Sequence, residues 1–331
     1  MSFPRYPQYR DSGVEWLGEV PGHWEVKSIR YILNAIGDVD HFMPVSVESG
    51  VPYLMTGDLK DLVSDVRLED CKQVSRDDYL QLSKRIGTSK GDVVMARYAT
   101  IGTLMYVDAD VEFLVSYSCV TLKTNPSKMS GMYLFQYMKS APFRRGIEHQ
   151  TNTNTQGNVG IKDLQGLKVA APPVDEQAAI AAFLNRETAK IDALVAEQEK
   201  LIALLKEKRQ AVISHTVTKG LDASVSMKDS GVEWLGVVPA HWGVVPLGKV
   251  TVARCDGPFG SGLKSEHYTD AGVRVVRLQN VRSDGFNGVD EAFIAPDYYD
   301  RELSGHDVIA GDVLIAGLGD ECAREGATLA Q

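Results

Sequence analysis

Several signatures of metal and redox chemistry are missing from this sequence. Its four cysteines lie far apart with no Cys-x-x-Cys pair, which argues against a zinc site and against a disulfide framework. We expect these thiols to be reduced and mostly buried. The seven histidines include no His-Glu-x-x-His pattern, so metal catalysis has no support.

Two motifs of nucleotide chemistry are also missing. An adenine methyltransferase grips the flipped base with an Asn-Pro-Pro-aromatic motif, but Ala171 precedes Pro172 and Pro173 here and Val174 follows them. A phosphate-binding loop needs a lysine directly after its closing glycine, and Lys264 in the stretch 257–265 comes one residue too late. We therefore expect no cofactor in this chain.

No stretch approaches 18 uninterrupted apolar residues, and the first ten residues are polar, so we expect no membrane span, no signal peptide and a cytoplasmic protein. The 331 residues are 44% hydrophobic, enough for two ordinary cores. The net charge of -9 opposes nucleic-acid binding unless basic residues cluster locally or a partner supplies most phosphate contacts. The alternative is that the acidity only aids solubility.

A sequence repeat organises the chain. Asp11 to Val26 and Asp229 to Val244 are identical at 13 of 16 positions, an offset of 218 residues. Such a period is too long for a solenoid and indicates a duplicated domain plus a linker. His23 and Trp24 recur as His241 and Trp242, and we interpret them as a packing cluster that fixes domain entry; base stacking is the alternative.

Weaker similarity continues after the repeat. Residues 51–59 resemble 273–281 as apolar strands, and 90–95 resemble 310–315 as a Gly-Asp turn that opens into a strand. A helix-like piece that contains tyrosine precedes each Gly-Asp turn, at 76–84 and at 296–303. The sequence therefore predicts an α+β fold with two similar mixed α/β modules, the second of which is incomplete at Gln331.

A long helix is predicted between the modules. From Val174 to about His215 the chain lacks proline and glycine and is rich in strong helix formers, with Pro172–Pro173 before it and Gly220 after it. A seam of mainly apolar residues, interrupted by Glu187, Gln198 and Lys208, recurs at alternating steps of four and three. This spacing is typical of a coiled coil and predicts pairing with another helix. The apolar seam positions are Ile180, Leu184, Ile191, Leu194, Leu201, Leu205 and Val212. The alternative is an ordinary core helix that folds back along its own modules.

These features together resemble the specificity subunit of a type I restriction-modification enzyme, truncated within its second target-recognition domain. The resemblance rests on the Ser-Gly-Val-Glu-Trp-Leu-Gly-x-Val-Pro-x-His-Trp motif at 12–24 and 230–242, the stretch PPVDEQAAIAAFL at 172–184, and the run that ends at 217–220. It covers the whole chain and implies a first target-recognition domain at 1–173, a conserved spacer helix at 174–219 and a truncated second domain at 220–331.

The resemblance also implies a function and partners. The chain would read a split site in double-stranded DNA without catalysis of its own. It would direct two adenine-specific methyltransferase subunits, and nuclease or translocase subunits, which would hold S-adenosylmethionine, ATP and Mg²⁺.

Base edges are read by arginine or lysine at guanine and by asparagine or glutamine at adenine. The first module offers Lys84, Arg85, Arg97, Tyr98, Arg144, Arg145, Gln150, Asn152, Asn154 and Gln156, and the second offers Lys264, Arg277 and Gln279. Many of these side chains are as well suited to phosphates as to bases. For the stretch 149–158 the alternative is a polar turn region.

Two other functions remain open. In the first, the chain would be the recognition end of a fused restriction-methylation enzyme. In the second, it would be a half-subunit that dimerises through its helix or sequesters methyltransferase. The amino-acid sequence does not indicate which DNA sequence would be recognised.

Overall fold

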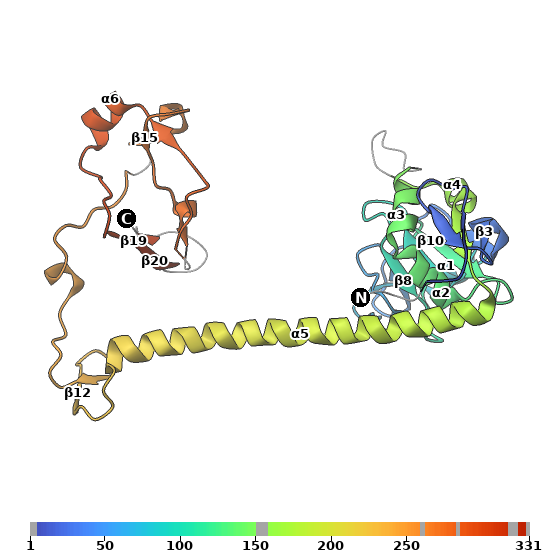
Figure 1. Cartoon of the computed structure of the whole chain (residues 1–331), viewed down its shortest axis with the longest axis horizontal. Helices are drawn as coiled ribbons and strands as arrows, with labels where there is room; N and C mark the ends of the chain where they lie inside the picture. Colours follow the sequence, from blue (N-terminus) through green and yellow to red (C-terminus); the bar gives the residue numbers. More distant parts are fainter. Residues whose placement is uncertain (1–4, 150–157, 259–261, 283–284, 317–323, 329–331) are drawn as a thin grey trace. The chain divides into compact units, whose positions relative to one another are not determined.

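A computed structural model describes residues 5–149, 158–258, 262–282, 285–316 and 324–328 (Figure 1). The chain divides into two compact units, residues 1–208 and 209–331. The division falls inside the long helix α5 (Val174–Lys219). Both helices and sheets are present, so the predicted α+β class is confirmed.

A four-stranded antiparallel sheet forms the centre of the first unit. Its strand order is β4 (Leu33–Gly37), β10 (Cys119–Thr124), β7 (Val93–Ala96) and β8 (Leu104–Tyr106). All four residues of β7 are buried, because successive side chains of a strand point to opposite faces and both faces of this sheet are covered. Val93 and Met95 belong to one hydrophobic cluster, and Val94 and Ala96 to another.

Three short helices help to cover the first face: α2 (Gly131–Met138), α3 (Ala141–Glu148) and α4 (Ile161–Gly166). Ser130 and Ser140 cap α2 and α3 by accepting hydrogen bonds from backbone amides of the first turn. Ala181 of α5 is buried in the same cluster, so the start of the long helix belongs to this core.

Beyond the second face lies a smaller sheet with the order β6 (Lys72–Val74), β5 (Val51–Leu54) and β9 (Leu114–Val115). Helix α1 (Arg76–Ser83) follows β6 and is capped by Ser75. The strand predicted for 51–59 is therefore shorter than expected and ends at Leu54, because Met55 begins a turn closed by Asp58.

Short pairs of strands complete the first unit. They are β1 (Tyr9–Asp11) with β2 (Glu19–Pro21), and β3 (Glu25–Ser28) with β11 (Lys168–Ala171). Two 3-10 turns, η1 (Ile29–Tyr31) and η2 (Val63–Asp65), join the larger elements. We call the β1–β2 pair and the residues after it, 9–24, hairpin 1.

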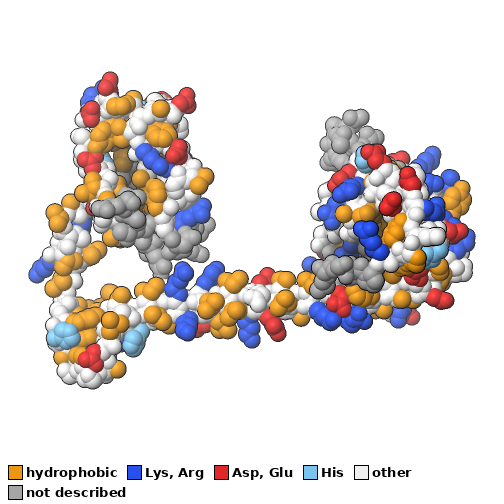
Figure 2. All heavy atoms as spheres, viewed as in Figure 1, with side chains coloured by type: hydrophobic (Ala, Val, Ile, Leu, Met, Phe, Trp, Pro, Cys, Tyr) orange, Lys and Arg blue, Asp and Glu red, His pale blue; other side chains and the backbone are white. Residues whose placement is uncertain are grey.

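Helix α5 runs for 46 residues, which confirms the predicted long helix. It begins directly after Pro172–Pro173 and is followed by Gly220, whose φ of 77° is the left-handed conformation that glycine adopts at a helix end. From Ile191 to His215 every residue is exposed. Figure 2 shows hydrophobic side chains on its surface among lysines, arginines and acidic residues.

The second unit is built from short strands. The hairpin of β12 (Met227–Asp229) and β13 (Val237–Pro239) belongs to hairpin 2, residues 227–242. The other strands pair as β14-β18-β15, β16-β17 and β19-β20. Their bounds are Tyr268–Thr269, Phe293–Ile294, Val273–Arg274, Val281–Arg282, Gly285–Phe286, Val313–Ala316 and Arg324–Thr328 in that order.

Helical pieces of the second unit are equally short: η3 (Leu247–Lys249), η4 (Ser265–His267), η5 (Leu278–Asn280), α6 (Pro296–Tyr298) and η6 (Tyr299–Leu303). The strand predicted for 273–281 breaks after Arg274, and η5 follows.

The cysteine prediction holds in part. Cys71 and Cys119 are buried, and burial raises the pKa of the Cys119 thiol to about 12. Cys255 is exposed, which the sequence did not predict. Cys322 lies outside the described residues.

Candidate nucleic-acid interface

One edge of the central sheet gathers several of the predicted DNA-binding residues. In the antiparallel order β4-β10-β7-β8, strands β4 and β7 end at the edge where β10 and β8 begin. Asp38 therefore lies after β4 and Arg97 after β7, close to each other, although 59 residues separate them in the chain. We call this region the sheet edge.

Arg97 is buried at the sheet edge and pairs with Asp38. Arg97 is 5% exposed and Asp38 3%, and Arg97 Nη2 donates to the Asp38 carboxylate at 2.5 Å. Its other terminal nitrogen donates to the carbonyl oxygen of Val159 at 3.2 Å. The structure thus places Arg97 in a buried internal ion pair. Sequence reasoning missed Asp38, since a single aspartate after a strand carries no distinctive signal.

Arg85 reaches the same aspartate from the end of α1. Its Nη2 lies 3.0 Å from Asp38 Oδ1, and its Nη1 donates to Asp40 at 3.1 Å. The Arg85 side chain remains half exposed. Neighbouring Lys84 is exposed and has no ion pair among the described residues.

Tyr98 follows Arg97 into the turn between β7 and β8. Its backbone pairs with Asn158, which closes the predicted polar stretch. Ala99 comes next, with φ of 56°, a left-handed conformation that a non-glycine residue seldom adopts. Strain of this kind often marks a functional site. Gln150, Asn152, Asn154 and Gln156 lie outside the described residues.

Helix α3 carries the arginine pair beside this turn. Arg144 and Arg145 are exposed, whereas Gly146 is buried against Trp16. A Cβ at Gly146 would come within 2.8 Å of the Trp16 indole nitrogen, so this close approach fixes the helix and directs its arginines outward.

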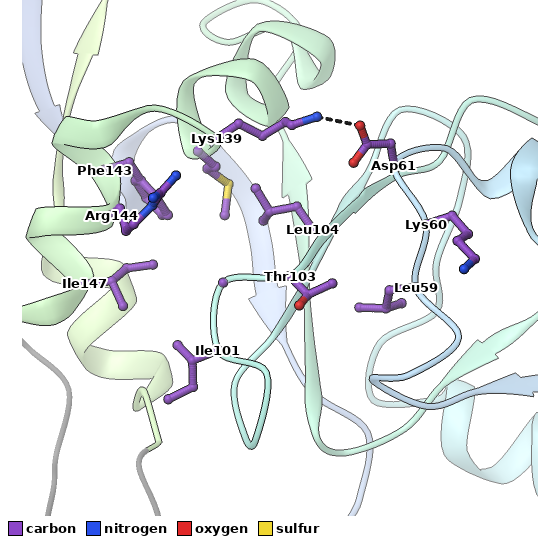
Figure 3. Close-up of a pocket in the computed structure, with 12 residues that line it drawn as sticks. Leu59, Lys60, Asp61, Ile101, Thr103, Leu104, Lys139, Phe143, Arg144 and Ile147 are labelled. Atoms are coloured by element: carbon purple, nitrogen blue, oxygen red, sulfur yellow. Dashed lines mark hydrogen bonds and ion pairs between the residues drawn. The ribbon is translucent and has the colours of Figure 1, made fainter. Parts of the chain in front are cut away.

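A hollow of about 490 Å³ lies between α3, the β7–β8 turn and residues 59–61 (Figure 3). Its floor is apolar and includes Ile101 and Phe143. Three cationic side chains line it, and Figure 3 shows that one of them is paired, Lys139 with Asp61 at 2.5 Å. Lys60 and Arg144 are the others. Sequence reasoning missed Lys60 and Lys139, because they are distant in sequence from the arginine pair.

The candidates in the second unit differ in availability. Lys264 and Gln279 are exposed. Arg277 donates from one nitrogen to both oxygens of Asp290 at 2.8 Å, so its guanidinium is held inside the unit.

The predicted seam residues of α5 fall into two groups. Ile180 and Leu184 are partly buried, and Ile180 packs against the core of the first unit. The later ones are exposed by 47% to 59%: Ile191, Leu194, Leu201, Leu205 and Val212.

A second cluster joins residues 6–24 to the first turn of α5. The sequence predicted a cluster at His23 and Trp24 but not its link to Tyr6 and Glu176. The Glu176 carboxylate accepts hydrogen bonds from Tyr6 Oη, from His23 Nε2 at 2.9 Å and from Trp24 Nε1 at 3.2 Å. Burial acts to raise the Glu176 pKa, but these three hydrogen bonds outweigh it and lower the pKa below its ordinary value. The hydrogen bond to Glu176 in turn raises the Tyr6 pKa to about 12. His23 and Trp24 thus link hairpin 1 to the first turn of α5 through a carboxylate.

Within the described part of the chain, no three histidine, cysteine or acidic side chains are grouped so as to hold a metal ion. No helix there combines the length and apolar character that a membrane span needs.

Comparison with known proteins gives a consistent family. The type I restriction enzyme MjaVIII specificity subunit of Methanocaldococcus jannaschii is 24% identical over 290 residues, which cover 85% of this chain and 61% of that protein. This chain spans about 60% of the length of the curated relatives it matches.

Two solved structures are similar over part of their length. The HsdS subunit from Thermoanaerobacter tengcongensis has 18% identity and a TM-score of 0.45 over 62% of this chain and 47% of that one. The type I restriction-modification S subunit from M. genitalium has 17% identity and a TM-score of 0.37 over 82% and 62%. The family profile described as the type I restriction modification DNA specificity domain matches residues 21–203, more than half of the sequence. This chain therefore belongs to the type I restriction-modification DNA specificity family.

Proposed function

We propose that this chain reads a sequence in double-stranded DNA through its first unit and performs no chemistry itself. One observation carries the proposal: the exposed arginines of α3, the cationic hollow and the strained turn at Ala99 lie together beside the sheet edge. Cationic side chains at the surface favour contacts to phosphates, which position a protein on DNA.

Arg144 and Arg145 are the residues to test first. The double variant with alanine at both positions should bind DNA more weakly, and the slope of log affinity against log salt should fall by about one for each phosphate that an arginine no longer neutralises. A base contact would instead cost roughly 1–3 kcal/mol on one sequence and change the preferred base there. Fluorescence anisotropy distinguishes phosphate contact from base contact when it is measured both on a duplex of random sequence and on a duplex selected for tight binding.

Arg30→Ala is the matched control. Arg30 is an exposed arginine in η1, which precedes the start of β4 and so lies at the opposite edge of the sheet. A double variant that binds as tightly as the Arg30 control would contradict the proposed surface.

Arg97 has a positioning role in this proposal. Its ion pair with Asp38 and its hydrogen bond to Val159 hold the end of the polar stretch against β7. Arg277 plays a similar part in the second unit through Asp290. Lys84, Arg85, Tyr98, Lys264 and Gln279 remain candidates for contact with DNA.

The partners belong to the proposal as well. Two adenine-specific methyltransferase subunits and nuclease or translocase subunits would assemble with this chain, and S-adenosylmethionine, ATP and Mg²⁺ would bind to them. Purified chain mixed with DNA and S-adenosylmethionine should transfer no methyl group until a methyltransferase subunit is added. Transfer by the chain alone would indicate the recognition end of a fused enzyme instead. The domains in this proposal are 1–173, 174–219 and 220–331.

Self-pairing through α5 is the second candidate function. It is favoured by the exposed apolar side chains of the seam, because Leu194, Leu201 and Leu205 are about half exposed and a helix partner would bury them. Sedimentation velocity over a range of concentrations tests it, and a chain that remains monomeric throughout would exclude pairing by this route.

A further inference from the structure

Hairpin 1 and hairpin 2 have the same local structure. In each, an aspartate accepts from the amide of the glycine two residues later, at 2.8 Å for Gly13 and 2.9 Å for Gly231. The two turns also match in φ, 69° at Gly13 and 73° at Gly231. The strand register is the same in both, since the first strand residue faces the proline that ends the second strand. The His-Trp pair therefore occupies the same place within each hairpin.

Among the described residues, the His-Trp pair donates to a carboxylate in only one of the two copies. In hairpin 1, His23 and Trp24 bind the Glu176 carboxylate. In hairpin 2, the side-chain nitrogens of His241 and Trp242 have no hydrogen-bond partner among the described residues. His241 is exposed and Trp242 is half-buried.

A hollow of about 430 Å³ lies beside this second pair, at the C-terminal end of α5. It is lined mainly by apolar surface, with Thr216 and Gly220 from the helix end and Pro239 from the hairpin. The indole of Trp242 forms one wall, because a Cβ at Gly220 would lie 3.6 Å from its ring.

One cation and one carboxylate line the hollow, beside the His-Trp pair. Lys219 lines it, and its ammonium group donates to the Val237 carbonyl oxygen at the hairpin. Position 224, which corresponds to Tyr6 at the same offset of 218 residues, is a serine whose hydroxyl donates to Asp222 at 2.6 Å. Two of the three donors of the first copy, the histidine and the tryptophan, are thus present. Asp222 also lines the hollow and is the one acidic group among the described residues there.

We propose that this hollow binds the first turn of a partner helix that carries a glutamate, in the manner in which hairpin 1 binds Glu176. The occupant is a helix start of the Pro-Pro-x-x-Glu type, with its glutamate accepting from Trp242 Nε1 and His241. A carboxylate in this position makes charge-assisted hydrogen bonds, which are about twice as strong as neutral ones.

A peptide titration of the whole chain tests the proposal. The probe is an acetylated peptide with the sequence of residues 172–190, and the matched control is the same peptide with glutamine in place of the glutamate at position 176. The readout is the indole NH signals of the four tryptophans, with Trp242 assigned by Trp242→Phe. The Trp242 signal should move and saturate, and the glutamine peptide should bind about tenfold more weakly.

Asp222→Asn supplies a second arm. Removal of this charge from the wall should tighten the glutamate peptide and leave the glutamine peptide unchanged, because only the former is repelled. Equal binding of both peptides, or no movement of Trp242, would overturn the proposal. Movement of Trp24 in its place would show that the peptide displaces the start of α5 from hairpin 1, and this also overturns it. A Trp242 shift that grows with protein concentration without peptide would assign the hollow to a second copy instead.

Discussion

Glu176→Gln tests whether a single carboxylate holds hairpin 1 on the start of α5. The substitution keeps the size of the side chain but removes the charge and places an NH₂ group among three donors. Hydrogen bonds to a charged group contribute about 1.5–3 kcal/mol each, but His23 is half exposed and its share is reduced by solvent. We therefore expect the free energy of unfolding to fall by about 2–4 kcal/mol at neutral pH.

The pH dependence gives a sharper version of this test. The folded-state pKa of Glu176 is lowered, so its contribution is present above the ordinary value of 4.5 and is lost as pH falls through the folded pKa. The wild type should therefore approach the variant in acid. Tyr6 has the opposite sign: with a pKa raised from 10.0 to about 12, its contribution is present below pH 10 and is lost as pH rises through about 12.

Urea unfolding at a series of pH values measures both effects, and amide hydrogen exchange in hairpin 1 locates them. Glu187→Gln is the matched control, since Glu187 lies on the same helix and pairs only with exposed Lys190 and Arg186 among the described residues. Equal stability of Glu176→Gln and wild type at neutral pH would refute the argument. A difference that persists unchanged in strong acid would refute the role of the charge.

Three further outcomes follow from the same structure. Asp38→Ala leaves the buried Arg97 guanidinium without its partner and should cost about 3–5 kcal/mol in urea unfolding; a loss below about 1 kcal/mol would show that the pair is not buried in solution. Gly146→Ala forces a methyl group against Trp16 and should lower stability by about 1–3 kcal/mol, measured by thermal unfolding; an unchanged melting temperature would contradict the close packing of α3 on Trp16. Leu205→Lys should leave the unfolding free energy within about 0.5 kcal/mol of wild type and abolish any self-association seen by sedimentation.

The parts of the fold that the sequence predicted depend on local interactions. Helix α5 is bounded by Pro172–Pro173 and Gly220, and each acts through its own backbone conformation. The repeat at 11–26 and 229–244 was found from sequence identity, and it corresponds to two hairpins whose turns are closed locally, as by Asp11 at Gly13.

The parts that the sequence missed depend on contacts between distant residues. Arginine is a residue type that can read bases, but nothing in the sequence indicated that Arg97 pairs with Asp38, which is 59 residues away and close to it only through strand pairing. Glu176 and Trp24 are 152 residues apart. No periodicity reports such pairs, so the sequence identified both arginine and tryptophan as notable and could not supply their partners.

The two hairpins also show how one motif can serve two ends of a helix. Hairpin 1 uses the nitrogen atoms of its His-Trp pair on Glu176, in the first turn of α5. Hairpin 2 uses the ring of Trp242 and the Pro239 side chain against Gly220, just after the last turn. Because these contacts involve different atoms, the ring of Trp242 can stay packed while its Nε1 remains available to a ligand. Alanine at Trp242 would therefore loosen the hairpin and remove the donor at once, whereas Asp222→Asn changes only the charge that an incoming carboxylate meets.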